Sequence, residues 1–472
     1  MKIRRSYSFF SNGYRENDVF SKLFHLLQSL TLASLSKQKK HLSFSALRDS
    51  ISSTFGAIHD NREQGKCNYS QHDVLMSAFA CMYFQDPSLN EFQRRMQEEQ
   101  HQNNLKTLFG VKNIPQNTQL RDILDEISSE ALAPIFKDFF NRLRRHKHLE
   151  DYAILPNLLL CAIDGTQYHS SKDICCEHCL HKKHKTGEIT YSHAVLQGAI
   201  MHPDKKQVLP VMPEAIANTD GADKQDCESN AAKRFIKNLK QAHPRQGFLV
   251  VGDGLMSHQP MIETFIGEGA HVLFVAKPGD HTYMFEWLEA YSELPSLEIV
   301  DEKGRTHHYC WQNKIPLHGE KEAIEVNFME YTLKNKSGKI TFRNSWVTDI
   351  KISQQNIIQL TQAGRCRWKI ENECFNTLKN QGYYIEHNYG HGKKHLSYNM
   401  YLLTLLAFYF HQIFELTDGA YQACRKKFGS KRYMWEVFRG TIRLLIFSSW
   451  EQLMDFLLYP EKYKDMSLVK RA

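Results

Sequence analysis

The stretch that most constrains the fold of this chain is Leu158–Thr166, with the sequence LLLCAIDGT. A short apolar run that stops at turn residues predicts a buried strand. Asp164 stands where this strand is expected to leave the core, and Gly165 would let the backbone turn away. A carboxylate at the end of a central strand is a frequent position for a catalytic group in an α/β protein. An acidic residue that simply begins a turn gives the same pattern.

A second strand ends in the same way. Gly247–Gly252 (GFLVVG) is an apolar run, and Asp253 and Gly254 follow it directly. If the two strands are neighbours in one sheet, Asp164 and Asp253 share an edge of that sheet. Two such carboxylates repel each other, and the arrangement is stable mainly when a divalent cation lies between them.

The segment Arg365–Lys379 offers a third acid on a predicted helix. At about 100° per residue, Arg367 and Glu371 are i, i+4 neighbours on one face, and Lys379 lies about 80° round from Glu371. Glu373 lies about 200° away and points elsewhere. An ordinary amphipathic helix with an Arg–Glu pair has the same pattern. Three apolar side chains are predicted to anchor this helix to the core: Trp368, Ile370 and Cys374.

Three carboxylates with oxygen ligands predict two Mg²⁺ ions at Asp164, Asp253 and Glu371. Two such ions can clamp an in-line displacement at phosphorus, one activating the attacking oxygen and the other stabilising the leaving oxygen. The formal net charge of +8, from 60 basic and 52 acidic residues, weakly favours a polyanionic partner.

The alternation of strand and helix patterns after residue 155 predicts an α/β fold. We expect the 472 residues to divide into five parts: a helical N-terminal region (1–150), the first part of a catalytic domain (155–284), an inserted β subdomain (285–347), the last part of the catalytic domain with the Glu helix (348–415), and a basic helical C-terminal region (416–472). Within residues 1–60, Phe20–Leu35 and Leu42–Phe55 have helical spacing, and this region could contact DNA or form a packing layer.

The sequence predicts a protein that remains inside the cell. Met1–Tyr14 lacks the apolar core and cleavage site of a secretory signal. The longest apolar stretch, Tyr398–Phe414, is interrupted by His411 and Gln412 and is predicted to be a buried core helix. The 11 cysteines show no disulfide framework, so we expect reduced thiols and a cytoplasmic protein.

Four segments carry a resemblance to a known family: AIDGTQYHSS, KQDCESNAAKRF, VVGDGL and RWKIENECFNTLKNQGYYIEHNYGHG. They resemble the ribonuclease-H-like DDE transposases, most closely the insertion-sequence-4-like group. The helix motif of that group has Arg, then Glu four residues on, then Lys seven further, with a Tyr before the Arg. Arg367 and Glu371 fit this motif, whereas Lys379 is eight residues after Glu371 and Gly364 stands where Tyr is expected.

The resemblance implies a ribonuclease-H-like mixed sheet with helices on both faces. It implies that Asp164, Asp253 and Glu371 bind two Mg²⁺ ions, with Mn²⁺ as a substitute, and that the enzyme cleaves DNA at transposon ends and joins the 3′ hydroxyl to target DNA. Double-stranded DNA would be the partner, for a homodimer associated with the nucleoid of a prokaryotic cell. Predicted DNA contacts are Arg367, Lys379, Lys277 and Trp311. Trp311 or Trp346 in the β insertion could stack on an extruded base or pack in the core.

Two other functions fit the same residues. One is a ribonuclease-H-like nuclease that cuts DNA without transferring a strand. The other is a non-catalytic DNA-binding or zinc protein that keeps the fold, although intact acids at all three positions argue against it.

Metal-ligand density is high in the segment Cys175–His184, CCEHCLHKKH. Only Leu180 separates the pair Cys176 and Cys179 from the pair His181 and His184, so a closed tetrahedral metal site in this short segment would be strained. The alternative is a polar, basic loop near the edge that carries the acids. His169 and His193 could also approach the acids, or be structural. Cys176, Cys179, His181 and His184 could make a compact Cys₂His₂ zinc site.

Overall fold

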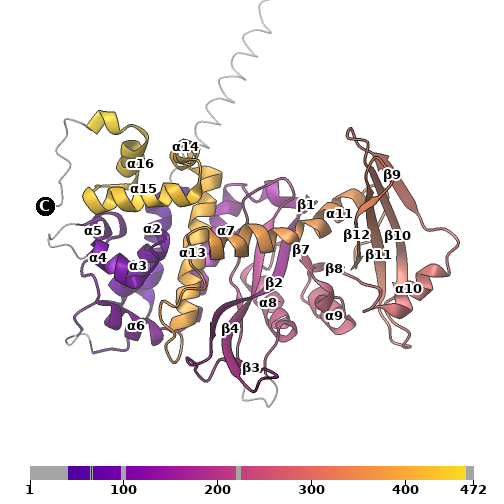
Figure 1. Cartoon of the computed structure of the whole chain (residues 1–472), viewed down its shortest axis with the longest axis horizontal. Coiled ribbons are helices and arrows are strands. Elements are labelled where there is room, and N and C mark those ends of the chain that lie inside the picture. Colours follow the sequence, from indigo (N-terminus) through magenta and orange to yellow (C-terminus); the bar gives the residue numbers. More distant parts are fainter. Residues whose placement is uncertain (1–40, 64, 66, 97–102, 219–224, 464–472) are drawn as a thin grey trace, which may run out of the picture.

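The computed structural model describes residues 41–63, 65, 67–96, 103–218 and 225–463. Figure 1 shows helices from both ends of the chain gathered at one end of the molecule, a sheet in the middle, and a β-rich arm at the opposite end. The protein therefore has a mixed α/β fold, as the sequence predicts.

One mixed sheet runs through the described part of the chain. Its strands are β1 (Ala153–Leu155), β2 (Leu158–Ser171), β3 (Leu180–Lys183), β4 (Ile189–Met201), β5 (Leu209–Pro210), β6 (Glu214–Ile216), β7 (Gly247–Gly252), β8 (His271–Val275), β9 (Ser296–Val300), β10 (Thr306–Pro316), β11 (Glu325–Lys334) and β12 (Ile340–Thr348). The main order is β3-β4-β2-β7-β8-β12-β11-β10-β9. β2, β7 and β8 run parallel to one another, whereas β4 is antiparallel to β2 and β12 is antiparallel to β8.

The two apolar runs found in the sequence are central neighbours in this sheet. The first half of β2 and nearly all of β7 are buried. Strands covered on both faces have continuous hydrophobic runs, because neither side of the strand faces water. The strands β9 to β12 extend the same sheet beyond β8, through the pairing of β12 with β8.

Helices cover the sheet and form the helical end of the molecule. The α-helices are α2 (Phe44–Ala57), α3 (Gln71–Tyr83), α4 (Leu89–Met96), α5 (Asn104–Phe109), α6 (Asn117–Asp125), α7 (Ala133–Arg145), α8 (Glu228–Ala242), α9 (Gln259–Gly267), α10 (Thr282–Glu289), α11 (Ile357–Cys366), α12 (Asn376–Asn380), α13 (Leu396–Thr417), α14 (Gly419–Phe428), α15 (Lys431–Leu444) and α16 (Trp450–Leu458). α8 packs on β4 and β6, and α9 packs on β8.

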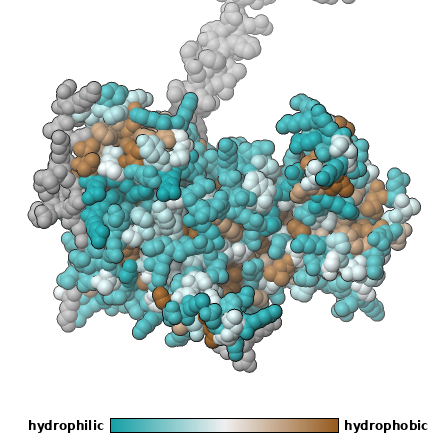
Figure 2. Space-filling model, viewed as in Figure 1, coloured by the Kyte–Doolittle hydropathy of each residue, from teal (hydrophilic) through white to brown (hydrophobic). Residues whose placement is uncertain are grey.

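The core of the helical end is built around α13. All of its residues from Asn399 to Phe414 are buried, as predicted for a core helix. Aromatic side chains from both ends of the chain meet there: Phe44 of α2 stacks on Trp450 of α16 with ring centroids 4.8 Å apart. No helix in the described part of the chain is long and apolar enough to cross a membrane. Figure 2 shows a mainly hydrophilic face, with hydrophobic residues gathered near the C-terminal helices.

The structure departs from the predicted elements in two places. The strand predicted at Gln207–Met212 pairs with β4 only over β5, although the N–H of Val211 still donates to the carbonyl of Gly198 at 3.0 Å. The helix predicted through Ser353–Asn380 is present from Ile357 to Asn380: Arg367 keeps helical backbone angles after α11, and a π-helical turn (Ile370–Phe375) leads into α12. The helix predicted at Phe20–Leu35 lies outside the described residues.

Candidate functional site

Asp164 lies within β2 rather than at its end. β2 continues to Ser171 in an antiparallel ladder with β4, in which Asp164 is opposite Gln197. The parallel pairing with β7 ends earlier, at Ala162 and Val251. The expectation that the chain turns away at Gly165 is therefore wrong. Asp164 still lies at an edge, because the neighbouring strand β7 has already ended beside it.

Gly165 has a different role, which is to make room for a further acid. A Cβ at Gly165 would lie 2.1 Å from Oε1 of Glu228, so the carboxylate of Glu228 packs directly on this glycine. Glu228 begins α8. Glu228 has no signal in the spacing of the apolar residues, although it lies in one of the four segments that carry the resemblance. Its nearness to Gly165 depends on how α8 packs, which spacing in the sequence does not reveal.

Asp253 follows β7 directly and lies at the same end of the sheet as Asp164. Its carboxylate accepts a hydrogen bond from the backbone N–H of Leu255 at 3.0 Å and caps a short 3₁₀ turn, Gly254–Met256. Lys277, an exposed residue just after β8, stands at the corresponding end of the next parallel strand. The first two predicted acids thus share one sheet edge.

The third acid reaches this edge through Arg367. The guanidinium of Arg367 lies 3.1 Å from Oδ2 of Asp164 and 2.6 Å from Oε1 of Glu371. The Arg367–Glu371 pair is the i, i+4 contact that the sequence predicted. Arg367 and Asp164 are about one quarter and one fifth exposed, and Glu371 is about half exposed. The helix segment is therefore docked on β2 by a partly buried ion pair.

The acids influence one another electrostatically. Burial raises the pKa of Asp164 above its ordinary value, Arg367 lowers it, and the charges of Glu371 and Asp253 raise it again. Burial also raises the pKa of Glu228, and the charges of Asp164 and Asp253 add to this effect. Four carboxylates from four parts of the chain therefore share one region of negative charge, and one guanidinium pairs with two of them, Asp164 and Glu371.

The π turn changes the position of Lys379 relative to Glu371. Two α-helical turns after Glu371 would end at Leu378, but a π turn takes up about one residue more than an α turn. With the first turn a π turn, the same face is reached at Lys379. The burial pattern agrees, since Leu378 is fully buried whereas Lys379 is partly exposed and pairs with Glu386 at 2.8 Å.

Lys369 anchors the segment that carries Glu371 to the loop after β4. It is 8% exposed, and its ammonium group donates hydrogen bonds of 2.7 Å to the backbone carbonyls of His202, Pro203 and Lys205. These carbonyls belong to the loop after β4. The segment that carries Glu371 is thus fixed to both β2 and the end of β4.

Of the tryptophans near the site, Trp368 departs from the position that helical spacing predicted. Trp368 does not anchor the helix, because 48% of it is exposed beside Arg367, whereas Ile370 and Cys374 are buried as predicted. Trp346 is 1% exposed and packs against Gly364, where an added Cβ would lie 2.6 Å from the indole ring. Trp346 therefore leaves no room for a larger side chain at position 364. Trp311 is also buried, at 8% exposure, as core packing requires.

The cysteine–histidine segment is organised around a different set of histidines. Nε2 of His193 lies 3.5 Å from Sγ of Cys176 and 3.4 Å from Sγ of Cys179. Nε2 of His391 lies 3.4 Å from Sγ of Cys179 and 3.1 Å from Nε2 of His193. The predicted ligand His184 points away, to the hydroxyl of Thr190 at 2.8 Å. The other predicted ligand, His181, is exposed on β3 and is not part of the group.

These four residues are distinct from the acids. In the described part of the chain, theirs is the only group of His, Cys, Asp or Glu ligand atoms that all lie within 4.8 Å of one another. Asp164, Asp253 and Glu371 are brought to one edge but do not form such a closed set. Burial, with His391 and His169 as further causes, lowers the pKa of His193 to about 3, so its imidazole is neutral at physiological pH. His169 and His193 thus face the cluster rather than the acids.

A comparison with protein families bears on the helical end of the chain. Residues 52–140 match the family model described as DDE_Tnp_1-associated. This match indicates a DDE-type transposase family. No curated protein matches the chain. The match suggests an enzyme related to transposases, and it covers a part of the chain that does not contain the acids.

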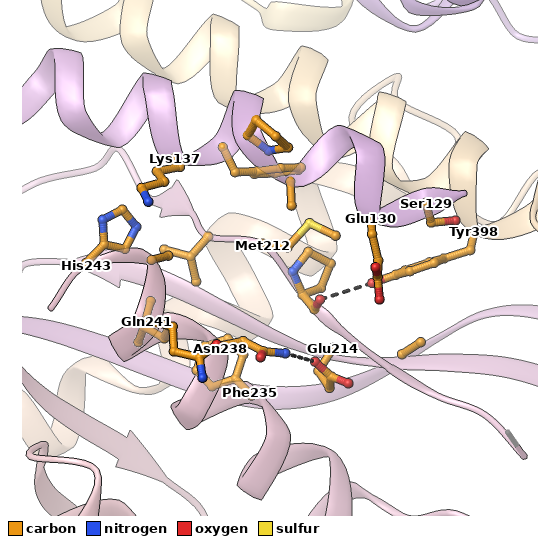
Figure 3. A pocket seen from close by; sticks show the side chains of 18 residues that line it. Ser129, Glu130, Lys137, Met212, Glu214, Phe235, Asn238, Gln241, His243 and Tyr398 are labelled. Carbon is orange, nitrogen blue, oxygen red and sulfur yellow. Dashed lines mark hydrogen bonds between the residues drawn. The ribbon is translucent and has the colours of Figure 1, made fainter. Parts of the chain in front are cut away.

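The transposase-associated segment borders a pocket. Figure 3 shows this pocket, of about 810 Å³, between that segment and the sheet. The hydroxyl of Tyr398 donates to the carbonyl of Pro213 at 3.0 Å, and Asn238 donates to Glu214 at 3.0 Å. The pocket contains none of the predicted acids and marks the junction between the two regions. Its labelled lining residues are Ser129, Glu130, Lys137, Met212, Glu214, Phe235, Asn238, Gln241, His243 and Tyr398.

Proposed function

We propose that this protein is a DDE-type DNA transposase with a ribonuclease-H-like catalytic domain, of the insertion-sequence-4-like group. It would cleave DNA at transposon ends and join the freed 3′ hydroxyl to target DNA. The observation that carries the proposal is the meeting of Asp164, Asp253 and Glu371, from three distant segments, at one end of parallel strands. The DDE_Tnp_1-associated match at residues 52–140 supports it independently of these acids.

The strand topology supports the ribonuclease-H-like assignment. A long strand, β2, pairs antiparallel with β4 on one side and parallel with β7 on the other, and β8 continues the parallel part. Asp164 and Asp253 then lie on adjacent strands, and Glu371 follows on a later helix, in the order that the resemblance implies. The strands β9 to β12 intervene between the second acid and the third.

The acidic residues fit divalent metal ions. Asp164, Asp253 and Glu371 supply oxygen ligands, which Mg²⁺ and Mn²⁺ prefer. Burial first, and then the charges of Glu371 and Asp253, raise the pKa of Asp164, and a bound cation would offset the repulsion among these carboxylates. When bound, such ions activate the attacking oxygen and stabilise the leaving oxygen of a phosphodiester. Glu228 adds a fourth carboxylate to this region, and Arg367 holds the carboxylates of Asp164 and Glu371 in place.

Basic residues around the acids would hold the DNA backbone. Arg367 and Lys379 flank Glu371 on one face, and Lys277 follows β8 at the edge that carries Asp253. Their charges suit phosphate contacts, which position DNA without reading its sequence. Trp368, which is exposed beside Arg367, is better placed than the buried Trp311 to stack on a base. Cleavage and joining at two ends would call for a homodimer.

A strand-transfer assay tests the proposal against its alternatives. The purified chain is incubated with Mg²⁺, a linear DNA carrying the sequences that flank its gene, and a supercoiled plasmid as target. The proposal predicts joined DNA. A pre-cleaved donor whose transposon end carries a 3′-dideoxynucleotide should not be joined, whereas the same donor with a 3′ hydroxyl should be. Cleavage without joining would support the nuclease, and binding without cleavage would support a non-catalytic DNA-binding protein.

A further inference from the structure

The cysteine–histidine cluster consists of Cys176, Cys179, His193 and His391, which come from three separate segments. The cysteines lie in the loop between β2 and β3, His193 lies on β4, and His391 lies in the loop before α13. Cys179 and His391 are 212 residues apart in the sequence. Such a meeting of four metal-binding side chains does not follow from local spacing.

The distances within the cluster match those around a tetrahedral zinc ion. Zn–S bonds of about 2.3 Å and Zn–N bonds of about 2.0–2.1 Å place two sulfurs about 3.8 Å apart, a sulfur and a nitrogen about 3.5 Å apart, and two nitrogens about 3.3 Å apart. The observed S–S distance is 3.8 Å, the three short S–N distances are 3.4–3.5 Å, and the N–N distance is 3.1 Å.

The surroundings orient the ligand atoms toward the centre of the cluster. Nδ1 of His391 donates to the carbonyl of Gly392 at 2.9 Å, which leaves the lone pair of Nε2 directed at the cysteines. The backbone N–H of Cys176 points to Sγ of Cys179 at 3.4 Å, a contact that stabilises a thiolate. Each of these contacts is of the kind that accompanies metal ligation.

The loop that carries His391 is fixed by contacts outside the cluster. The carboxylate of Asp125 accepts hydrogen bonds from four successive backbone N–H groups, of residues 393 to 396, at 2.8–3.0 Å. Gly392 has a φ of +68°, and a Cβ there would lie 2.2 Å from this carboxylate. His391 is therefore held in position by α6, independently of its cysteine and histidine neighbours.

We propose that Cys176, Cys179, His193 and His391 bind one structural zinc ion. Two thiolates and two imidazoles complete a tetrahedron, so the site is closed and leaves no position for a substrate. The ion would link the ends of β2 and β4, the strand pair that carries Asp164, to the segment that follows Lys379. Its role would be to hold the edge of the candidate catalytic domain together, and it is independent of whether the acids are catalytic.

Metal analysis of the full-length, untagged protein, purified without chelator, tests the proposal. We expect about one zinc per chain in the wild type and its loss in Cys179→Ser, His193→Ala and His391→Ala. The matched control is His181→Ala combined with His184→Ala, which removes two exposed histidines of the same segment and should retain the zinc. A strong chelator should lower the melting temperature of the wild type and of the control.

A second measurement keeps the test decisive if the cysteine variant does not fold. Cobalt exchanged into the wild type and His391→Ala reports on the ligands, because tetrahedral Co²⁺ with thiolates has characteristic visible absorption. We expect this absorption in the wild type and its loss or shift in His391→Ala. The proposal is overturned if the wild type neither contains nor takes up zinc, if zinc depends on His181 and His184 instead, or if Cys176 and Cys179 form a disulfide in the native protein.

Discussion

Arg367 donates a hydrogen bond to Asp164 at 3.1 Å, although 203 residues separate them. The same guanidinium reaches Glu371 at 2.6 Å. Arg367 therefore docks the helix segment on β2 and balances the negative charge of two carboxylates. Removing the guanidinium would leave both carboxylates without their nearest cation.

The loss of Arg367 should shift the pH dependence of activity. Arg367 lowers the pKa of Asp164 against the effect of burial, so Arg367→Gln should raise that pKa. In the proposed mechanism Asp164 must be ionised to bind metal, so activity should fall at a higher pH in the variant as the solution is acidified. The pH–rate profile of Mg²⁺-dependent cleavage measures this shift. Arg432→Gln, which breaks the exposed i, i+4 pair with Glu436, should leave the profile unchanged.

The acids should also couple metal binding to stability. The pKa values of Asp164 and Glu228 are higher in the folded protein than in the unfolded chain. The stability that their neutral forms contribute is therefore fully present at a pH below the pKa values of the unfolded chain. It is lost as the pH rises through the pKa values of the folded protein. At pH 7 Mg²⁺ should therefore raise the melting temperature of the wild type. Glu228→Gln should melt higher than the wild type without metal and gain less from Mg²⁺, and the first difference should vanish at acidic pH.

Thermal melting at pH 7 and at acidic pH, with and without Mg²⁺, measures these effects. Glu263→Gln changes an exposed acid on α9 and serves as the control, with no expected effect. Equal Mg²⁺ shifts in Glu228→Gln and the wild type would exclude Glu228 from the metal-responsive region.

The close contact between Gly165 and Glu228 predicts a coupled pair of mutations. Gly165→Ala should lower the free energy of unfolding by about 1–3 kcal/mol, because the new methyl group collides with the carboxylate. In a Glu228→Ala background the same substitution should have a much smaller effect. Denaturant unfolding of the four proteins measures the coupling, and additive effects would contradict the contact. Gly267→Ala, where nothing lies within 4 Å of the new Cβ, is the control.

The sequence predicts the parts of the site that depend on regular spacing. The apolar runs of β2 and β7 locate Asp164 and Asp253, and helical spacing gives the Arg367–Glu371 pair. Features that depend on packing are not predictable in this way. Glu228 reaches Gly165 through the placement of α8, His391 reaches Cys179 across 212 residues, and the π turn that realigns Lys379 has no signal in the apolar pattern.

The close packing of Trp346 against Gly364 can be tested. Gly364→Tyr would force the new side chain into the indole ring, so we expect a loss of about 1–3 kcal/mol in the free energy of unfolding, or more. Gly440 is an exposed residue of α15, and nothing lies within 4 Å of a Cβ added there. Gly440→Ala should therefore raise the free energy of unfolding by about 0.5–1 kcal/mol. A neutral effect of Gly364→Tyr would contradict the close packing of Trp346 on Gly364.

The central claim is that Asp164, Asp253 and Glu371 act together in metal-dependent DNA cleavage. The most direct measurement compares Mg²⁺-dependent cleavage of the gene's flanking DNA by the wild type and by Asp164→Asn, Asp253→Asn, Glu371→Gln and Glu373→Gln, with DNA binding measured in parallel. The account predicts that the first three variants bind DNA but do not cleave it, and that Glu373→Gln cleaves like the wild type. Full cleavage by Glu371→Gln, or its loss in Glu373→Gln alone, would contradict the account.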